Sequence, residues 1–140
     1  MKVFLDTNVW LSATVFAGLC EDIVVQCADR GWLVSSHLVR TEAHDVLERK
    51  FPRQTEAFKL FDAVWQSSIM INDVAQPAED NDERLIRAVL QANCDFFVTG
   101  DKRVLSWMQK PPKFLPLEKL RIVSPRDAWG ELFGASPGVR

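Results

Sequence analysis

Short apolar runs alternate with helical patterns along the whole chain of 140 residues. Runs this short are typical of buried strands, and helices between successive strands are typical of a parallel sheet. The sequence therefore predicts an α/β fold with strands at residues 3–5, 32–34, 69–71, 96–99 and 120–123.

The predicted helices lie between these strands and after the last of them. One helical pattern runs through residues 20–25 and stops near Gly31, because glycine suits the position after a helix end. A second helix is expected to begin at a cap formed by Ser35 or Ser36 and to reach about Lys50. The remaining helices are predicted at residues 55–66, 79–93, 104–109 and 125–133.

The chain is expected to form one domain over residues 1–133, followed by a flexible tail at 134–140 rich in Gly, Pro and Ser. Its composition, 47% hydrophobic and 26% charged, is that of an ordinary globular protein. The net charge of −2 excludes a globally basic nucleic-acid-binding protein but leaves room for a local basic patch.

The three cysteines, Cys20, Cys27 and Cys94, form no zinc or C-x-x-C motif. We expect them to be reduced thiols, as in cytosolic proteins. The sequence has no apolar run near the roughly 18 residues of a membrane span, and Asp6 comes too early for a secretory signal. These features predict a cytoplasmic protein with no membrane partner.

Two acids, Asp6 and Asp101, each follow directly on a strand that is predicted to be buried. Ligands bind at the carboxyl edge of an open parallel sheet, so both carboxylates are expected at one edge. Each residue also has an ordinary alternative role. Asp6 would serve as a helix cap, and Asp101 as a turn residue after Gly100.

Two further acids, Glu42 and Asp82, fall on the apolar faces of predicted helices. At about 100° per residue, Glu42 lies within the arc of Leu38 and Val46, and Asp82 projects onto the apolar face of residues 85–90. A buried carboxylate costs several kcal/mol unless it is paired or binds a metal. The alternative for Asp82 is that it only caps its helix, while the neighbouring acids Asp80 and Glu83 are exposed to solvent.

Four converging carboxylates need a proton, a basic partner or a divalent cation, because like charges about 4 Å apart repel by roughly 4 kcal/mol at an effective dielectric of 20. No Lys or Arg falls on either apolar arc. Mg²⁺ or Mn²⁺, which prefer oxygen ligands, are therefore the predicted partners. A site of this kind binds phosphate oxygens and activates water, which favours hydrolysis of phosphodiesters.

Four parts of the sequence form a recognisable pattern: Asp6-Thr7-Asn8-Val9, Glu42, Asp82 and Phe97-Val98-Thr99-Gly100-Asp101-Lys102. In their order and spacing the chain resembles the PIN domain family from Met1 to about Phe133. The nearest group is the toxin component of bacterial toxin–antitoxin pairs (VapC-like). The resemblance implies a three-layer α/β/α sandwich with a parallel sheet, and a ribonuclease dependent on Mg²⁺ or Mn²⁺. We expect its substrate to be single-stranded RNA and its partner a cognate antitoxin, and a homodimer is a further candidate assembly.

The resemblance assigns Asp6, Glu42, Asp82 and Asp101 as the metal-binding and catalytic acids. It also implies that two polar residues support the site by orienting Asp6 and Asp101. These are Asn8 and Thr99.

The chain departs from the family pattern at two places. The family often has Asp-Pro-Asp-Asp before the third acid, whereas this chain has Glu-Asp-Asn-Asp at 79–82, which brings Asp80 into question. Asp80 falls about 200° away on the outer side of the helix, so we assign Asp82. Arg103 stands where the family often has an acid, and we expect this change to affect substrate contacts and not the metal site.

Two groups of basic residues are candidates for contacting the RNA backbone, although a charge run is more often a solvated face. They are Lys102, Arg103, Lys110 and Lys113, and Arg49, Lys50 and Arg53. His37 and His44 are expected at the surface or in loops rather than as ligands. The five tryptophans are expected mostly in the core.

Two rival classes of enzyme are disfavoured by the residues after Asp6. A phosphoacceptor receiver domain needs adjacent acids there, and an aspartyl-nucleophile phosphatase needs an acid at position 8, where Asn8 stands. The remaining alternative is a catalytically silent PIN-like module that acts through RNA or protein binding.

Overall fold

The computed structural model describes residues 1–74, 80–116 and 119–134, so most of the predicted tail lies outside the described residues. Five parallel strands form one sheet in the order β3-β2-β1-β4-β5. The predicted parallel α/β fold is confirmed. The strands are β1 (Val3–Leu5), β2 (Leu33–Ser35), β3 (Ile69–Met70), β4 (Phe96–Val98) and β5 (Arg121–Val123).

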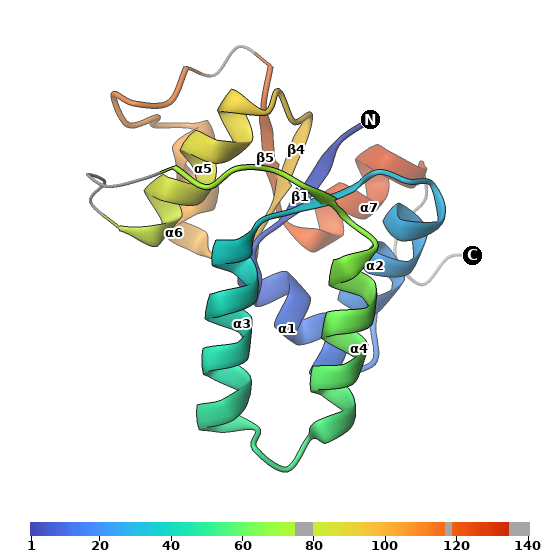
Figure 1. The fold of residues 1–140 in the computed structure, drawn as a ribbon. Coiled ribbons are helices and arrows are strands. Elements are labelled where there is room, and N and C mark those ends of the chain that lie inside the picture. Colours follow the sequence, from blue (N-terminus) through green and yellow to red (C-terminus); the bar gives the residue numbers. More distant parts are fainter. Residues whose placement is uncertain (75–79, 117–118, 135–140) are drawn as a thin grey trace.

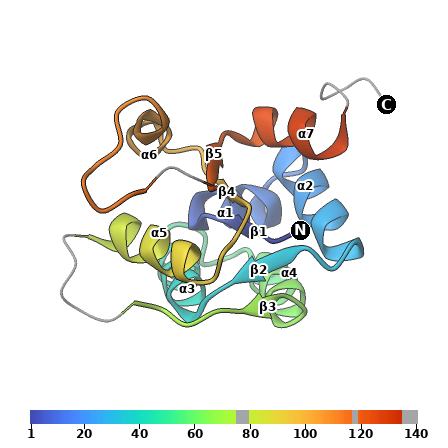
Figure 2. The ribbon, with the colours of Figure 1, turned by 90° about the horizontal axis from the view of Figure 1, so that it is seen from above.

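Helices cover both faces of the sheet in three α/β/α layers (Figures 1 and 2). One layer is a set of helices that pack on one another: α1 (Thr7–Val15), α2 (Leu19–Asp29), α3 (His37–Lys50), α4 (Thr55–Gln66) and α7 (Pro125–Phe133). The first three strands extend the sheet from β1 to one edge, and the chain then crosses back to add β4 and β5 on the other side of β1. Because crossovers between parallel strands are right-handed as a rule, this change of direction places the next helices on the opposite face of the sheet. These are α5 (Asn81–Gln91), α6 (Lys102–Leu105) and the 3₁₀ turn η1 (Ser106–Met108).

The central strand β1 is completely buried, and its aromatic neighbours fill the core on both sides. Phe4 stacks on Phe97 of β4 with ring centroids 5.7 Å apart, and Trp10 meets Phe61 edge to face at 5.2 Å. As expected, most of the tryptophans are buried; Trp32 is only partly so. This packing fixes the carboxyl ends of β1 and β4, which are the ends that Asp6 and Asp101 follow.

Three local features differ from the predictions. The third strand is an exposed edge strand, with Ile69 46% exposed. A separate helix, α1, precedes the predicted one and is divided from it at Gly18, whose φ of 149° favours glycine. Ser36 occupies the cap position of α3 without a side-chain capping bond, and Asp73 Oδ2 instead accepts a hydrogen bond from the Leu38 amide at 3.0 Å.

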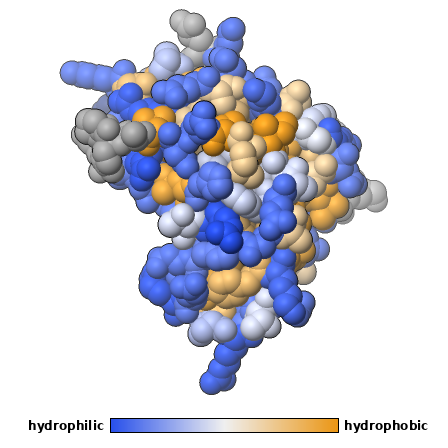
Figure 3. All heavy atoms as spheres, viewed as in Figure 1, coloured by the Kyte–Doolittle hydropathy of each residue, from blue (hydrophilic) through white to orange (hydrophobic). Residues whose placement is uncertain are grey.

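Hydrophilic side chains dominate the face of the molecule in Figure 3, with apolar groups in smaller patches between them. Within the described residues, no single helix has the length and apolarity to cross a membrane. Helices α1 and α2 reach that length and composition only as a pair, and this pair bends by 106°.

Candidate active site

Asp6 is the most deeply buried acid of the candidate site, with 4% of its surface exposed. It follows β1 and caps α1, where its Oδ1 accepts a hydrogen bond from the Thr7 amide at 2.7 Å. Its Oδ2 accepts from the Thr99 hydroxyl at 2.8 Å and from Asn8 Nδ2 at 3.1 Å. Asp6 therefore caps α1 and also belongs to the candidate site.

Asn8 and Thr99 join the ends of β1 and β4. Asn8 Oδ1 accepts from the Gly100 amide at 2.9 Å, and its Nδ2 donates to Thr99 Oγ1 at 3.3 Å. Thr99 Oγ1 in turn accepts from the Asp101 amide at 3.0 Å. These bonds fix the chain on either side of Gly100 relative to the Asp6 carboxylate.

Glu42 of α3 is half-buried and contacts two other helices at their first residues. Its Oε1 accepts from the Thr7 hydroxyl at 2.8 Å, and its Oε2 accepts from Asn81 Nδ2 at 3.1 Å. Glu42 therefore lies where α1, α3 and α5 meet. Neither partner was singled out from the sequence, although Thr7 lies within the Asp-Thr-Asn segment.

Asp82 is half-buried near the start of α5 and is not the helix cap. The cap is Asp80, whose Oδ1 accepts from the Glu83 amide at 2.9 Å. Arg103 forms a fork onto both acids: its Nη2 lies 2.7 Å from Asp80 Oδ2 and its Nη1 lies 3.1 Å from Asp82 Oδ2. The guanidinium also lies 5.2 Å from the ring centroid of Trp107.

This fork corrects two expectations. Arg103 was expected to leave the metal site untouched, yet its guanidinium bonds directly to Asp82. Asp80 was placed away from the site by helical geometry, but it precedes the helix in an extended conformation, to which the 100° rule does not apply. A basic partner thus comes from α6, although neither apolar arc carries one.

Asp101 follows the loop after β4 and caps α6. Its Oδ1 accepts from the amides of Arg103 at 2.8 Å and Val104 at 3.4 Å. Its Oδ2 takes no part in this cap and remains the candidate ligand atom.

The four acids interact electrostatically, and these interactions affect the pKa values of Asp6 and Asp82. Burial raises the pKa of Asp6 from 3.8 to about 7, against hydrogen bonds from Thr99 and Thr7 that lower it; the charges of Asp82 and Glu42 raise it further. The pKa of Asp82 is also raised, first by burial and then by the negative charges of Asp101, Asp80 and Glu42. Arg103 opposes this second shift without cancelling it.

The donor set fits a hard divalent cation in its chemistry. All of the candidate ligands are carboxylate oxygens. Burial, with a smaller contribution from neighbouring acids, raises the pKa of Asp6 and Asp82, and a cation would relieve this cost of the charged form. The four acidic side chains do not converge on a single point in this structure. Among the described residues, no three His, Cys, Asp or Glu side chains are placed to hold an ion together.

Neither histidine lies among these acids in the hydrogen-bond network. His37 is exposed at the start of α3. His44 was expected on an outward face, but that face is covered by α4, where its Nε2 lies 2.7 Å from Asp62 Oδ1 and its ring contacts Phe58 and Phe61.

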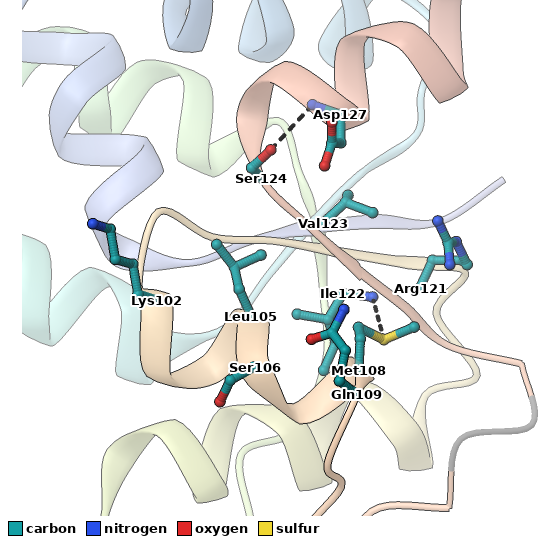
Figure 4. Close-up of a pocket in the computed structure, with 10 residues that line it drawn as sticks. All are labelled: Lys102, Leu105, Ser106, Met108, Gln109, Arg121, Ile122, Val123, Ser124 and Asp127. Atoms are coloured by element: carbon teal, nitrogen blue, oxygen red, sulfur yellow. Dashed lines mark hydrogen bonds between the residues drawn. The ribbon is translucent and has the colours of Figure 1, made fainter.

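Two hollows are lined in part by residues that follow β4. One, of about 510 Å³, is lined by Asn8, Gly100 and Asp101 together with Pro125. The other, of about 410 Å³, lies between the α6–η1 segment and β5, and its lining includes Lys102 directly after Asp101 (Figure 4). Of the four acids, only Asp101 lines one of these hollows, and it lines the first.

A family model described as PIN domain matches residues 2–103. The chain therefore belongs to the PIN domain family. The matched segment contains Asp6, Glu42, Asp82 and Asp101. PIN domains are typically metal-dependent nucleases. No curated protein matches the chain.

Proposed function

We propose that this chain is a ribonuclease that depends on Mg²⁺ or Mn²⁺ and hydrolyses phosphodiester bonds of single-stranded RNA. The observation that carries the proposal is the electrostatic coupling of Asp6, Glu42 and Asp82, to which Asp101 is coupled in turn. Acids whose pKa is raised by burial together with the charges of neighbouring acids, as for Asp6 and Asp82, are common at functional sites. Within a family of nucleases, this clustering favours catalysis over a structural role.

The four acids would hold the cation, and the cation would supply Lewis-acid activation of the phosphodiester and of water. Asn8 and Thr99 orient the Asp6 carboxylate through bonds at 3.1 and 2.8 Å. Thr7 and Asn81 orient Glu42 in the same way. The chain's own contribution is thus a set of carboxylates whose directions are fixed by neighbouring donors.

Binding of RNA by an acidic chain needs local positive charge near the site. Lys102, Lys110 and Lys113 are exposed and belong to the segment that follows Asp101. Contacts from these side chains to the RNA backbone would guide a single strand past the hollow that Asp101 lines. The group at residues 49–53 lies at the far end of α3 and is the second candidate.

We further propose that the chain is the toxin of a toxin–antitoxin pair, with a cognate antitoxin protein as its partner and a homodimer as a candidate assembly. The resemblance of the sequence to the PIN domain family, within which the toxin group is the nearest, motivates this role. The free cysteines Cys20, Cys27 and Cys94 fit a reducing compartment such as the cytoplasm.

A second candidate is a catalytically silent PIN module that binds RNA or protein. Two observations favour it: Arg103 is bonded to Asp82, and no three acids within the described residues are placed to hold an ion. A cleavage assay separates the two functions.

The assay uses end-labelled single-stranded RNAs with Mg²⁺, Mn²⁺ or EDTA, and duplex RNA and single-stranded DNA as further substrates. We expect single-stranded RNA to be cut only with the cations, and Asp6→Asn to abolish cleavage. Glu56→Gln, at an exposed acid of α4 that pairs with Lys59 and not with the four acids, is the matched control and should cleave as the wild type does. RNA binding without cleavage in any cation would favour the silent module, and equal cleavage by Asp6→Asn would contradict the proposal.

A further inference from the structure

Arg103 is held by contacts on three sides at the edge of the acidic cluster. Its two terminal nitrogens bond to Asp80 at 2.7 Å and Asp82 at 3.1 Å, and its guanidinium lies over the ring of Trp107. Its backbone is fixed as well, because its amide donates to Asp101 Oδ1. The side chain is 54% exposed, so solvent and ions reach it.

The position of this positive charge matters because Asp82 lies among several other acids. Asp80, Asp101 and Glu42 all act on it. The guanidinium occupies Asp82 Oδ2, one of the two oxygens that the carboxylate has for a cation. A divalent cation on the same carboxylate would be repelled by the guanidinium at this distance.

We infer that Arg103 is an internal counter-cation that must leave Asp82 before a divalent cation binds among the acids, and that it thereby lowers the chain's affinity for metal. The inference rests on the proposed function of the site. The exchange is feasible because solvent-exposed ion pairs are weak and are screened by salt. Arg103 is a positioning residue in this account and acts through Asp82.

The structure supplies a closely matched control in Arg40. Arg40 also pairs with an aspartate, Asp62 at 3.5 Å, and also lies over a tryptophan ring, Trp65 at 5.6 Å. Its side chain is 44% exposed, against 54% for Arg103. Removing either arginine therefore removes one positive charge and one aromatic contact, but only Arg103 faces the acidic cluster.

The test is calorimetric titration of Mn²⁺ into the wild type, Arg103→Ala, Arg103→Gln and Arg40→Ala, with folding checked by circular dichroism. We expect both Arg103 variants to bind Mn²⁺ about two- to fivefold more tightly than the wild type, which is the effect of losing one exposed ion pair. Arg40→Ala should bind as the wild type does. Arg103→Gln removes the charge but keeps a polar side chain that can donate hydrogen bonds, so agreement between the two variants assigns the effect to the charge.

Two outcomes would overturn the inference, and they differ in what they say of the proposed function. If all four proteins bind Mn²⁺ with the same Kd, or the Arg103 variants bind more weakly, the counter-cation role is wrong while the metal site stands. If neither the wild type nor the Arg103 variants bind Mn²⁺, the proposed function fails as well.

Discussion

The hydroxyl of Thr99 donates a hydrogen bond of 2.8 Å to the carboxylate of Asp6, and so joins the ends of β4 and β1 at a buried acid. This bond and the Thr7 amide both favour the charged carboxylate, yet burial outweighs them and raises the pKa of Asp6 to about 7. The site therefore carries a carboxylate that is well oriented and poorly solvated. A proton or a cation would relieve that cost.

Removing the hydroxyl by Thr99→Val should lower the free energy of unfolding by about 1–3 kcal/mol, because buried hydrogen-bonding groups lose their partner. It should also raise the pKa of Asp6 further, since the lost bond favoured the charged form. Thr99→Ser keeps the hydroxyl and is the control. Urea unfolding and NMR titration of Asp6 measure the two effects; an unchanged pKa in Thr99→Val would contradict the assigned hydrogen bond.

The raised pKa of Asp6 predicts how stability depends on pH in EDTA. Folded Asp6 keeps its proton up to about pH 7, whereas its reference pKa is 3.8, so the folded state binds the extra proton between these values. The associated stability is complete below pH 3.8 and is lost as the pH rises through 7. The wild type should therefore lose about 2–3 kcal/mol between pH 5 and 8 relative to Asp6→Asn.

Urea unfolding of both proteins at several pH values measures this difference. Because the other titrating groups are common to the two proteins, their contributions largely cancel. Parallel pH profiles for wild type and Asp6→Asn would show that Asp6 has an ordinary pKa, and would remove the electrostatic basis of the site.

Much of this arrangement could be predicted from the sequence, for specific physical reasons. Asp6 was placed at the sheet edge because an apolar strand runs directly into it. Glu42 was singled out because a carboxylate on an apolar arc requires a partner. The structure gives both residues defined polar partners, Thr99 and Thr7.

The other features of the site depend on contacts between distant residues, which the periodicity of the sequence does not predict. Arg103 reaches Asp80 and Asp82 across 23 and 21 residues through a long flexible side chain. The outward face predicted for His44 is instead the surface on which α4 packs. Patterns along one helix indicate which side faces inward, but they do not show what covers the other side.

Substituting Glu42→Gln should leave the Tm in EDTA within a few degrees of the wild type. The amide keeps an oxygen for Thr7, and removing the charge relieves repulsion with Asp6 and Asp82. Affinity for Mn²⁺ should fall, because a ligand charge is lost. Thermal melts with and without Mn²⁺ measure both; an equal Mn²⁺-induced rise in Tm in the two proteins would exclude Glu42 from the site.

If the lysines after Asp101 contact the RNA backbone, the triple substitution of Lys102, Lys110 and Lys113 by Ala should weaken RNA binding and flatten its salt dependence. Each lost phosphate contact should reduce the slope of log K against log[salt] by roughly 0.7. Lys59→Ala on α4 is the control, because Lys59 is also exposed. Fluorescence anisotropy at several salt concentrations gives the slopes; an unchanged slope would assign these lysines to a solvated face.

The most direct test of the shared carboxylate site is a count of bound Mn²⁺ by electron paramagnetic resonance. The wild type should bind Mn²⁺ saturably, Asp6→Asn and Asp82→Asn should each lose most of this binding, and Glu56→Gln should keep it. Equal binding by all four proteins, or saturable binding by none, would contradict the claim that these distant acids form one cation site.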